Sequence, residues 1–196
     1  TIKNPSIKER LEDDYGEYTL LKNIQKNLNL QEVRCYTDGF RQHIENNGDI
    51  EWILNKELHS PSNDIPAKIK YYSDGSIQSE AYYINGKSHR ENSPALIFYK
   101  EDGSVSYEEH YIDGKRHRED GPALIYYYPD GSIKSEYYYV NGKSHRKEEP
   151  SYISYNPNGS IKYKEYHINN KLHRENGAAQ IWYNEDGSIQ YEEYYM

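Results

Sequence analysis

The chain has 196 residues, a formal net charge of -8 and 24 tyrosines, while hydrophobic residues make up 35% of it. This acidic balance offers no basic surface for a phosphate backbone or an anionic membrane, so we expect neither nucleic acid nor a membrane among its partners. A tyrosine can bury its ring while its hydroxyl stays in water. The composition therefore predicts a thin structure with little dry interior.

The first 45 residues differ in pattern from the rest of the chain. The stretch "EYTLLKNIQKNL" places Leu20, Leu21, Ile24 and Leu28 on one face of a helix. We therefore expect residues 1–45 to form a small helix-containing N-terminal cap.

Two features of the same segment bear on the cellular setting. The single cysteine, Cys35, excludes an internal disulfide, and no catalytic partner for it can be inferred. The start "TIKNPSIKER" is not a signal peptide, and no apolar run is long enough to span a membrane. We expect a cytoplasmic protein, in the host cytoplasm if the source is viral. Secretion stays open, because the chain does not begin with methionine.

A repeat of 28 residues fills the remainder of the chain. Glycines and His-Arg pairs keep this spacing; they are Gly75, Gly103, Gly131, Gly159 and Gly187, with His89 and Arg90, His117 and Arg118, His145 and Arg146, and His173 and Arg174. We expect one repeat domain over residues 46–196. It comprises a degenerate unit at 46–73, regular units at 74–101, 102–129, 130–157 and 158–185, and a partial unit at 186–196.

Each unit predicts two strands joined by tight turns. In "PDGSIKSEYYYVNGK" an Asp-Gly turn leads into a strand over 133–140, and Asn141-Gly142 forms the next turn. The polar connection "SHRKEEP" then leads to the following unit. The sequence thus predicts a mainly β fold, an elongated single-layer antiparallel sheet of stacked β-hairpins.

Strand alternation predicts how the side chains of 133–140 are distributed. Ile133, Ser135, Tyr137 and Tyr139 would share one face, and the residues between them the other. Neither face is cleanly apolar, so we expect both to be partly wet. Equivalent tyrosines would line up across the hairpins as a ladder, namely Tyr83, Tyr111, Tyr139 and Tyr195.

The segments "YPDGSIKSEYYYVNGK" and "DGKRHREDGPALIYY" resemble the MORN repeat, in particular the longer variants found in bacteria, phages and giant viruses. The resemblance covers residues 46–196. It implies a scaffold, dimeriser or partner-binding module, and variant members include antitoxin or immunity-type proteins. The unit here is longer than the usual MORN hairpin, and His-Arg-Glu replaces the usual His-Gly, so ligand details of ordinary MORN proteins are not transferred.

No residue set in the sequence predicts catalysis, a metal site or a cofactor. Equivalent histidines lie two strands apart, about 9.5 Å, which is too far for several of them to share one zinc ion. The His-Arg pairs are better explained as hydrogen-bonding links between neighbouring hairpins. No P-loop, dinucleotide fingerprint or Gly-x-Ser-x-Gly elbow is present. We therefore expect no enzyme.

We expect instead a protein partner, held by tyrosines and glutamates on one side of the sheet. The candidate partner-binding residues are Glu80, Tyr82, Glu108, Glu136, Tyr138, Tyr166 and Tyr194. An inhibitor or immunity-type role, in toxin neutralisation or in viral or phage counter-defence, fits this expectation. Two alternatives stay open: a self-assembling element that forms a homodimer through the C-terminal edge strand, and a carbohydrate-binding or hydrolytic repeat protein.

Overall fold

The computed structural model describes residues 7–13, 16–22, 30–146 and 148–195. These residues form strands, turns and irregular connections, without a helix among them. The chain divides into two compact blocks, Thr1–His89 and Arg90–Met196. We call them the N-terminal and the C-terminal block and describe each by itself.

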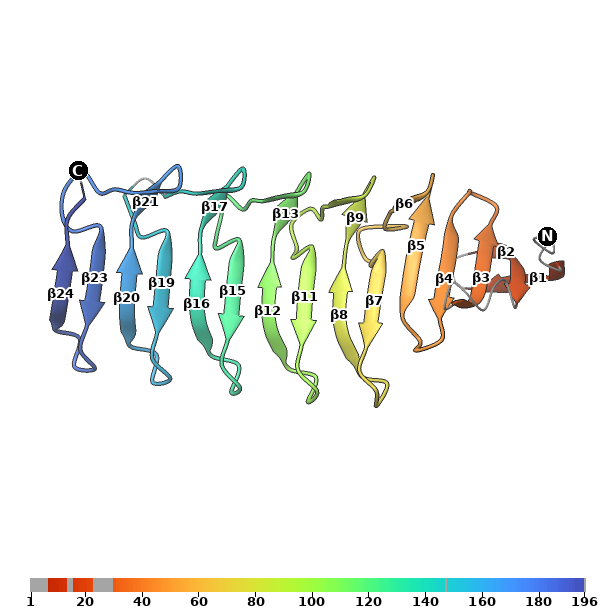
Figure 1. Ribbon diagram of the computed structural model, residues 1–196, viewed down its shortest axis with the longest axis horizontal. Helices are drawn as coiled ribbons and strands as arrows, with labels where there is room; N and C mark the ends of the chain where they lie inside the picture. The colour runs from red at the N-terminus through yellow and green to blue at the C-terminus, as the bar shows by residue number, and fades with distance from the viewer. Residues whose placement is uncertain (1–6, 14–15, 23–29, 147, 196) are drawn as a thin grey trace. The chain divides into compact units, whose positions relative to one another are not determined.

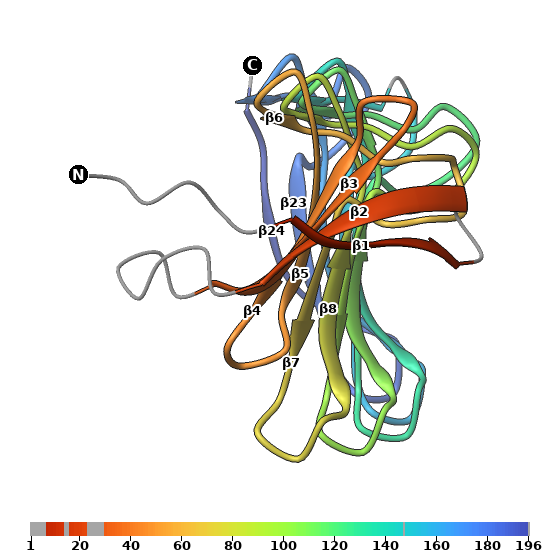
Figure 2. The same ribbon diagram turned by 90° about the vertical axis from the view of Figure 1, so that its right-hand side faces the viewer.

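The N-terminal block is an antiparallel sheet with the strand order β1-β2-β3-β4-β5-β7-β8, in which β6 pairs with β5, and β9 and β10 form a short separate hairpin. The strands are β1 Ile7–Asp13, β2 Gly16–Lys22, β3 Leu30–Tyr36, β4 Arg41–Glu45, β5 Ile50–Leu54, β6 Glu57–Leu58, β7 Lys68–Tyr71, β8 Ile77–Ala81, β9 Tyr83–Ile84 and β10 Lys87–Ser88. Figure 2 shows the twist of this sheet, since β1 and β2 run across the direction of β7 and β8. Its core is the pair Tyr36 and Trp52, with ring centroids 5.0 Å apart.

The predicted N-terminal helix is wrong wherever the structure describes it. Residues 16–22 form β2, which pairs with β1 on one side and with β3 on the other. A short apolar run fits a helix or a strand equally well, and pairing on both sides satisfies the backbone of β2 from outside the segment. Ile24 and Leu28, the other members of the expected helical face, lie outside the described residues.

The C-terminal block places its long strands side by side in the antiparallel order β11-β12-β15-β16-β19-β20-β23-β24, with β13–β14, β17–β18 and β21–β22 as short separate hairpins (Figure 1). The strands are β11 Leu96–Tyr99, β12 Val105–Glu109, β13 Tyr111–Ile112, β14 Lys115–Arg116, β15 Leu124–Tyr127, β16 Ile133–Tyr137, β17 Tyr139–Val140, β18 Lys143–Ser144, β19 Tyr152–Tyr155, β20 Ile161–Glu165, β21 His167–Ile168, β22 Lys171–Leu172, β23 Gln180–Tyr183 and β24 Ile189–Glu193. The prediction of a mainly β sheet of stacked hairpins is confirmed.

The turn that closes each long hairpin is built in the same way in every unit. In the β15–β16 turn, Asp130 Oδ1 accepts hydrogen bonds from the Ser132 backbone N–H at 2.9 Å and from its hydroxyl at 2.6 Å. Gly131, between them, has a φ of 84°, which a residue with a side chain rarely adopts. The recurring Asp-Gly-Ser sequence is therefore explained by its turn geometry.

The predicted strand over 133–140 is interrupted at Tyr138. Its N–H donates to the carbonyl of Ser151, and its carbonyl accepts from the N–H of His145. These bonds take Tyr138 out of the main ladder, so β16 ends at Tyr137 and the short hairpin β17–β18 begins at Tyr139. The expected alternation over eight residues is corrected accordingly.

The short hairpin β17–β18 closes on the predicted Asn-Gly turn. Asn141 and Gly142 have φ values of 51° and 78°, as tight hairpin turns require. The N–H of Gly142 donates to the carbonyl of Arg116 in the preceding short hairpin at 2.8 Å. Neighbouring units are thus joined at this end of the strands as well as through the long sheet.

Candidate partner-binding surface

The long strands of the C-terminal block expose two different faces. One carries isoleucines at the 28-residue spacing, and three of them are buried, Ile125, Ile153 and Ile181, with exposed fractions of 7%, 8% and 5%. Their cross-strand partners are charged: Glu108, Glu136, Lys164 and Glu192. We call this the isoleucine face. Its three isoleucines are buried, whereas Glu108 and Glu136 beside them are partly buried.

The opposite face carries a continuous run of aromatic side chains, and we call it the aromatic face. The run is Phe98, Tyr107, Tyr126, Tyr137, Tyr152, Tyr163, Trp182 and Tyr191, and successive ring centroids lie 4.3–6.1 Å apart. All but Tyr191 are partly buried, and Tyr191 is 52% exposed. Each such pair stabilises the sheet by about 0.5–1.5 kcal/mol beyond simple burial. The rings therefore take over the packing role of aliphatic residues while remaining partly accessible.

This run is not the tyrosine ladder expected from the sequence. Tyr111 and Tyr139 lie in the short hairpins, where the guanidinium of Arg116 stands 5.9 Å and 5.5 Å from their ring centroids. Arg116 also donates to the carboxylate of Glu109 at 2.6 Å, so its charge is matched. The equivalent tyrosines are linked through an arginine rather than by ring contacts.

A polar network braces the end of the aromatic face nearest the short hairpins. The hydroxyl of Tyr163 donates to Glu165 at 2.5 Å, and the amide of Gln180 donates to the same carboxylate at 2.9 Å. Burial first, and then the bond to Glu165, raise the pKa of Tyr163. These groups satisfy one another and hold the ring of Tyr163 in place.

The predicted partner-binding residues differ widely in accessibility, and of those in the C-terminal block Glu108 and Glu136 lie on the isoleucine face. Tyr82 and Tyr166 are buried, with 4% and 6% exposed, whereas Tyr194 is 67% exposed. Glu80, Glu108, Glu136 and Tyr138 are partly buried. Burial and the charge of Glu136 raise the pKa of Tyr138. Glu136 also accepts a hydrogen bond from the hydroxyl of Tyr155 at 2.7 Å.

The arginines of the His-Arg pairs stack on the tyrosines of this set. Arg146 lies 4.0 Å from the ring centroid of Tyr138, and Arg174 lies 3.9 Å from that of Tyr166. Each arginine also donates to a carbonyl four residues further on, for example Arg174 to Ala178 at 3.3 Å. The connection thereby folds over the isoleucine face and helps to bury it.

The histidines of the pairs lie beside the short hairpins. The Nδ1 of His117 accepts from the backbone N–H of Asn141, in the next unit, at 3.2 Å. In the N-terminal block, Nδ1 of His59 accepts from the N–H of Asn85 at 3.3 Å. Bonds of this kind link a connection to the turn of the following hairpin.

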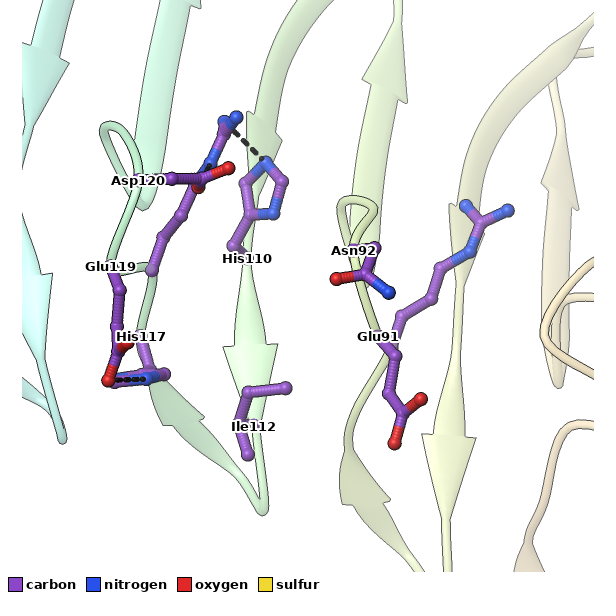
Figure 3. A pocket seen from close by; sticks show the side chains of 9 residues that line it. Glu91, Asn92, His110, Ile112, His117, Glu119 and Asp120 are labelled. Atoms are coloured by element: carbon purple, nitrogen blue, oxygen red, sulfur yellow. Dashed lines mark hydrogen bonds and ion pairs between the residues drawn. The ribbon is translucent and has the colours of Figure 1, made fainter.

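His110 stands where the neighbouring units carry Tyr138 and Tyr166. It is 8% exposed, and Arg118 Nη1 lies 3.1 Å from its Nε2 (Figure 3). Burial, followed by the positive charge of Arg118, lowers the pKa of His110 to about 4. Its neutral ring lines a cavity of about 450 Å³ together with Ile112, His117 and the acidic connection residues. In the aligned repeats this site stands out as a histidine in a column of tyrosines.

Other kinds of site find no support in the described part of the chain. Across those residues, no group of three or more histidine, cysteine or acidic side chains is placed to hold a metal ion. Nor do they include a long apolar helix of the kind that spans a lipid bilayer. Cys35 is a free, partly buried thiol.

The MORN repeat variant model matches the chain at residues 68–85, 124–141 and 178–196. Each match contains the two strands of a long hairpin and the Asp-Gly-Ser turn between them. The chain contains repeats of the MORN variant family. The intervening segments 96–113 and 152–169 form the same succession of strands, so the architecture extends beyond the matched residues. No curated protein matches the chain. The resemblance stated from the sequence is confirmed, and with it a repeat scaffold suited to interaction with proteins or lipids.

Proposed function

We propose that the chain is a non-enzymatic scaffold that binds a protein partner through its aromatic face. The observation that carries the proposal is the run of partly exposed rings from Phe98 to Tyr191 across the long strands of the C-terminal block. Tyrosine and tryptophan are enriched in protein interfaces because they supply a large, rigid contact area at low entropic cost. A protein is favoured over a lipid surface because the chain is acidic, with a net charge of -8.

The residues predicted from the sequence, among them Glu108, Glu136 and Tyr138, form the competing surface within this proposal. Their carboxylates and hydroxyls are engaged with the chain's own groups, as the bond from Tyr155 to Glu136 illustrates. The aromatic face presents a run of partly exposed rings across the long strands of the C-terminal block, so we place the partner there. An inhibitor or immunity-type role is the specific form we propose, in which the bound scaffold blocks a surface that the partner needs.

Affinity capture from the native host, followed by chemical cross-linking and mass spectrometry, tests the proposal. The wild-type chain should recover a stoichiometric protein, and a Y107S/Y191S variant that folds should recover much less of it. Equal recovery by both chains would refute the aromatic face as the binding surface. An inhibitory role additionally requires that the recovered protein lose its activity in the complex.

Self-assembly is a second candidate, favoured by the exposed apolar side chains of β24. Ile189 and Tyr191 are 53% and 52% exposed, and among the described strands β24 pairs with β23 on one side. A sheet with such a strand at its border can add a strand from another chain. Light scattering at micromolar concentration should then report a dimer, and a strict monomer would remove this candidate.

A further inference from the structure

One cross-strand row of the aromatic face lacks a ring on two neighbouring strands. This row runs through positions occupied by Phe98, Tyr107, Tyr126, Ser135, Ser154, Tyr163, Trp182 and Tyr191, as the strand register shows. Ser135 and Ser154 stand opposite each other in the middle of this row of rings. In the other units of the C-terminal block, the positions equivalent to these two serines carry aromatic residues, whereas the N-terminal block has Lys70 and Ser79 there.

The run of ring contacts passes around the serines. Tyr137 and Tyr152, the next cross-strand pair on the same face, stack on each other with centroids 4.3 Å apart. They meet Tyr126 and Tyr163 edgewise, with interplanar angles of 71° and 68°. Within the row, Tyr126 and Tyr163 each have a tilted ring partner on one neighbouring strand. On the other neighbouring strand each of them faces a serine.

The missing rings leave a hollow of about 460 Å³, which we call the serine gap. Its floor includes Ser135, which is 6% exposed, and Ser154. Tyr126, Tyr137, Tyr152 and Tyr163 line its walls. Tyr126 and Tyr163 are three strand spacings apart, roughly 14 Å, and the stacked pair Tyr137 and Tyr152 contacts both of them, so the hollow is the space over the two serines beside that stack.

Two lysines stand at this hollow because each long hairpin has a bulge. The register jumps from Ser135 to Ile133 opposite Tyr126 and Tyr127, which leaves Lys134 as the extra residue, and Lys162 occupies the same position in the next hairpin. A bulge residue is re-aimed relative to the regular alternation. Both lysines are exposed and line the serine gap. The equivalent bulge positions elsewhere hold Gln78, Ser106 and Gln190.

We propose that the serine gap is the anchor pocket of the scaffold and takes an aromatic side chain of the protein partner, with an acidic residue beside it that pairs with Lys134 or Lys162. The inference rests on the proposed function and names the chemistry of the partner at that face. An inserted ring would complete the interrupted row, packing between Tyr126 and Tyr163 as the chain's own rings do elsewhere. Buried aromatic anchors in pockets supply most of the binding energy of many interfaces.

A sugar fits the same hollow less well. A bound sugar needs several hydrogen-bonding groups that are not already engaged. Glu165, the carboxylate nearest in the register, already accepts hydrogen bonds from Tyr163 and Gln180. The lining offers two serine hydroxyls, tyrosine hydroxyls and two lysines. The lysines favour an acidic over a basic neighbour of the anchor by simple charge complementarity.

The test uses amide chemical shifts of the full chain titrated with short capped peptides. The probes are Glu-Trp-Glu, Lys-Trp-Lys and Glu-Ala-Glu, with maltotriose as the sugar. We expect Glu-Trp-Glu to shift the amides around Ser135 and Ser154, and to bind at least tenfold more tightly than the other three. Equal binding of the lysine peptide or of the alanine peptide, or a stronger response to maltotriose, would overturn the proposal.

Two variants test the site with chains that are expected to fold. S135Y/S154Y restores the rings that sibling units carry and should fold while losing at least tenfold in affinity for Glu-Trp-Glu. K134E/K162E changes exposed side chains only and should remove the preference for the acidic peptide. Unchanged binding in S135Y/S154Y would place the peptide elsewhere and refute the serine gap.

The same variants separate this inference from the proposed function. If S135Y/S154Y still captures the partner while Y107S/Y191S does not, the aromatic face binds but the serine gap is not its anchor. If neither variant changes capture, the proposed binding face itself is wrong.

Discussion

The two faces of the C-terminal block use neighbouring residues of the same strand in opposite ways. Ile125, Ile153 and Ile181 recur unchanged on one face and are buried, Ile181 in a cluster with Tyr166 and Ala178. The residues that follow them, Tyr126, Ser154 and Trp182, change from unit to unit on the other face. A position that must pack against a repeated neighbour has to repeat, whereas a face that meets something outside the repeat is free to differ. This contrast marks the isoleucine face as the structural one and the aromatic face as the one that carries specificity.

The largest expected effect is the loss of a buried isoleucine. I153A should lower the free energy of unfolding by about 2–5 kcal/mol, because it removes packed methyl groups and leaves a cavity. Urea unfolding followed by circular dichroism measures this. I133A is the matched control: Ile133 is 38% exposed, so its loss should be much smaller. Equal effects of the two substitutions would contradict the difference in packing.

Acid should weaken the packed side of the sheet through His110. The folded chain holds this ring neutral, with a pKa near 4, whereas the ring has its ordinary value of 6.5 when unfolded. The contribution is therefore complete above pH 6.5 and is lost as the pH falls toward 4, by about 3 kcal/mol. H110Y, which copies the neighbouring units, should remove this part of the pH dependence. Parallel urea curves at pH 7.5 and 4.5 for both chains would show it, and an unchanged dependence would refute the assignment.

Ring contacts on the aromatic face should contribute less per pair than the isoleucines. A double-mutant cycle with Y137L and Y152L should give a coupling of about 0.5–1.5 kcal/mol, as expected for stacked rings. Their centroids are 4.3 Å apart. A coupling near zero would mean that these rings merely cover the sheet.

The smallest change in stability is expected at the turns, which belong to neither face of the sheet. D130N should leave the unfolding midpoint almost unchanged, because Asn158 fills the same position in another unit with the same bond to Ser160 at 2.9 Å. D130A removes the acceptor for Ser132 and should lower the midpoint further. In addition, the bond from Ser132 holds the pKa of Asp130 below its usual value. The order of these two variants is the measurement, and a reversed order would contradict the turn geometry.

Much of this fold could be predicted from the sequence, because it depends on local turn chemistry. The 28-residue period, the Asp-Gly-Ser turns and the Asn-Gly turns all follow from residues close together in the chain. The break at Tyr138 could not be predicted, since it depends on a bond to Ser151 in the next connection. The predicted alternation of side chains between the two faces also does not hold across the bulge, because Lys134 is an extra residue there and shifts the register by one.

The candidate site was hidden for the same reason. Ser135 and Ser154 become neighbours only once the register between β16 and β19 is known. A weaker signal was present in the aligned repeats, where each serine interrupts a column of aromatic residues. The tyrosines selected from the sequence were those most regularly repeated, and regular repetition in this chain accompanies packing, as the burial of Tyr82 and Tyr166 shows.

The central claim is that the partner binds the aromatic face, and affinity measured by calorimetry with the captured partner tests it most directly. The comparison is between Y107S/Y191S on that face and E108Q/E136Q on the isoleucine face, with both folds checked by circular dichroism. Our account predicts at least a tenfold loss of affinity for the first variant and less than a threefold change for the second. The reverse order would contradict it and assign the binding surface to the isoleucine face.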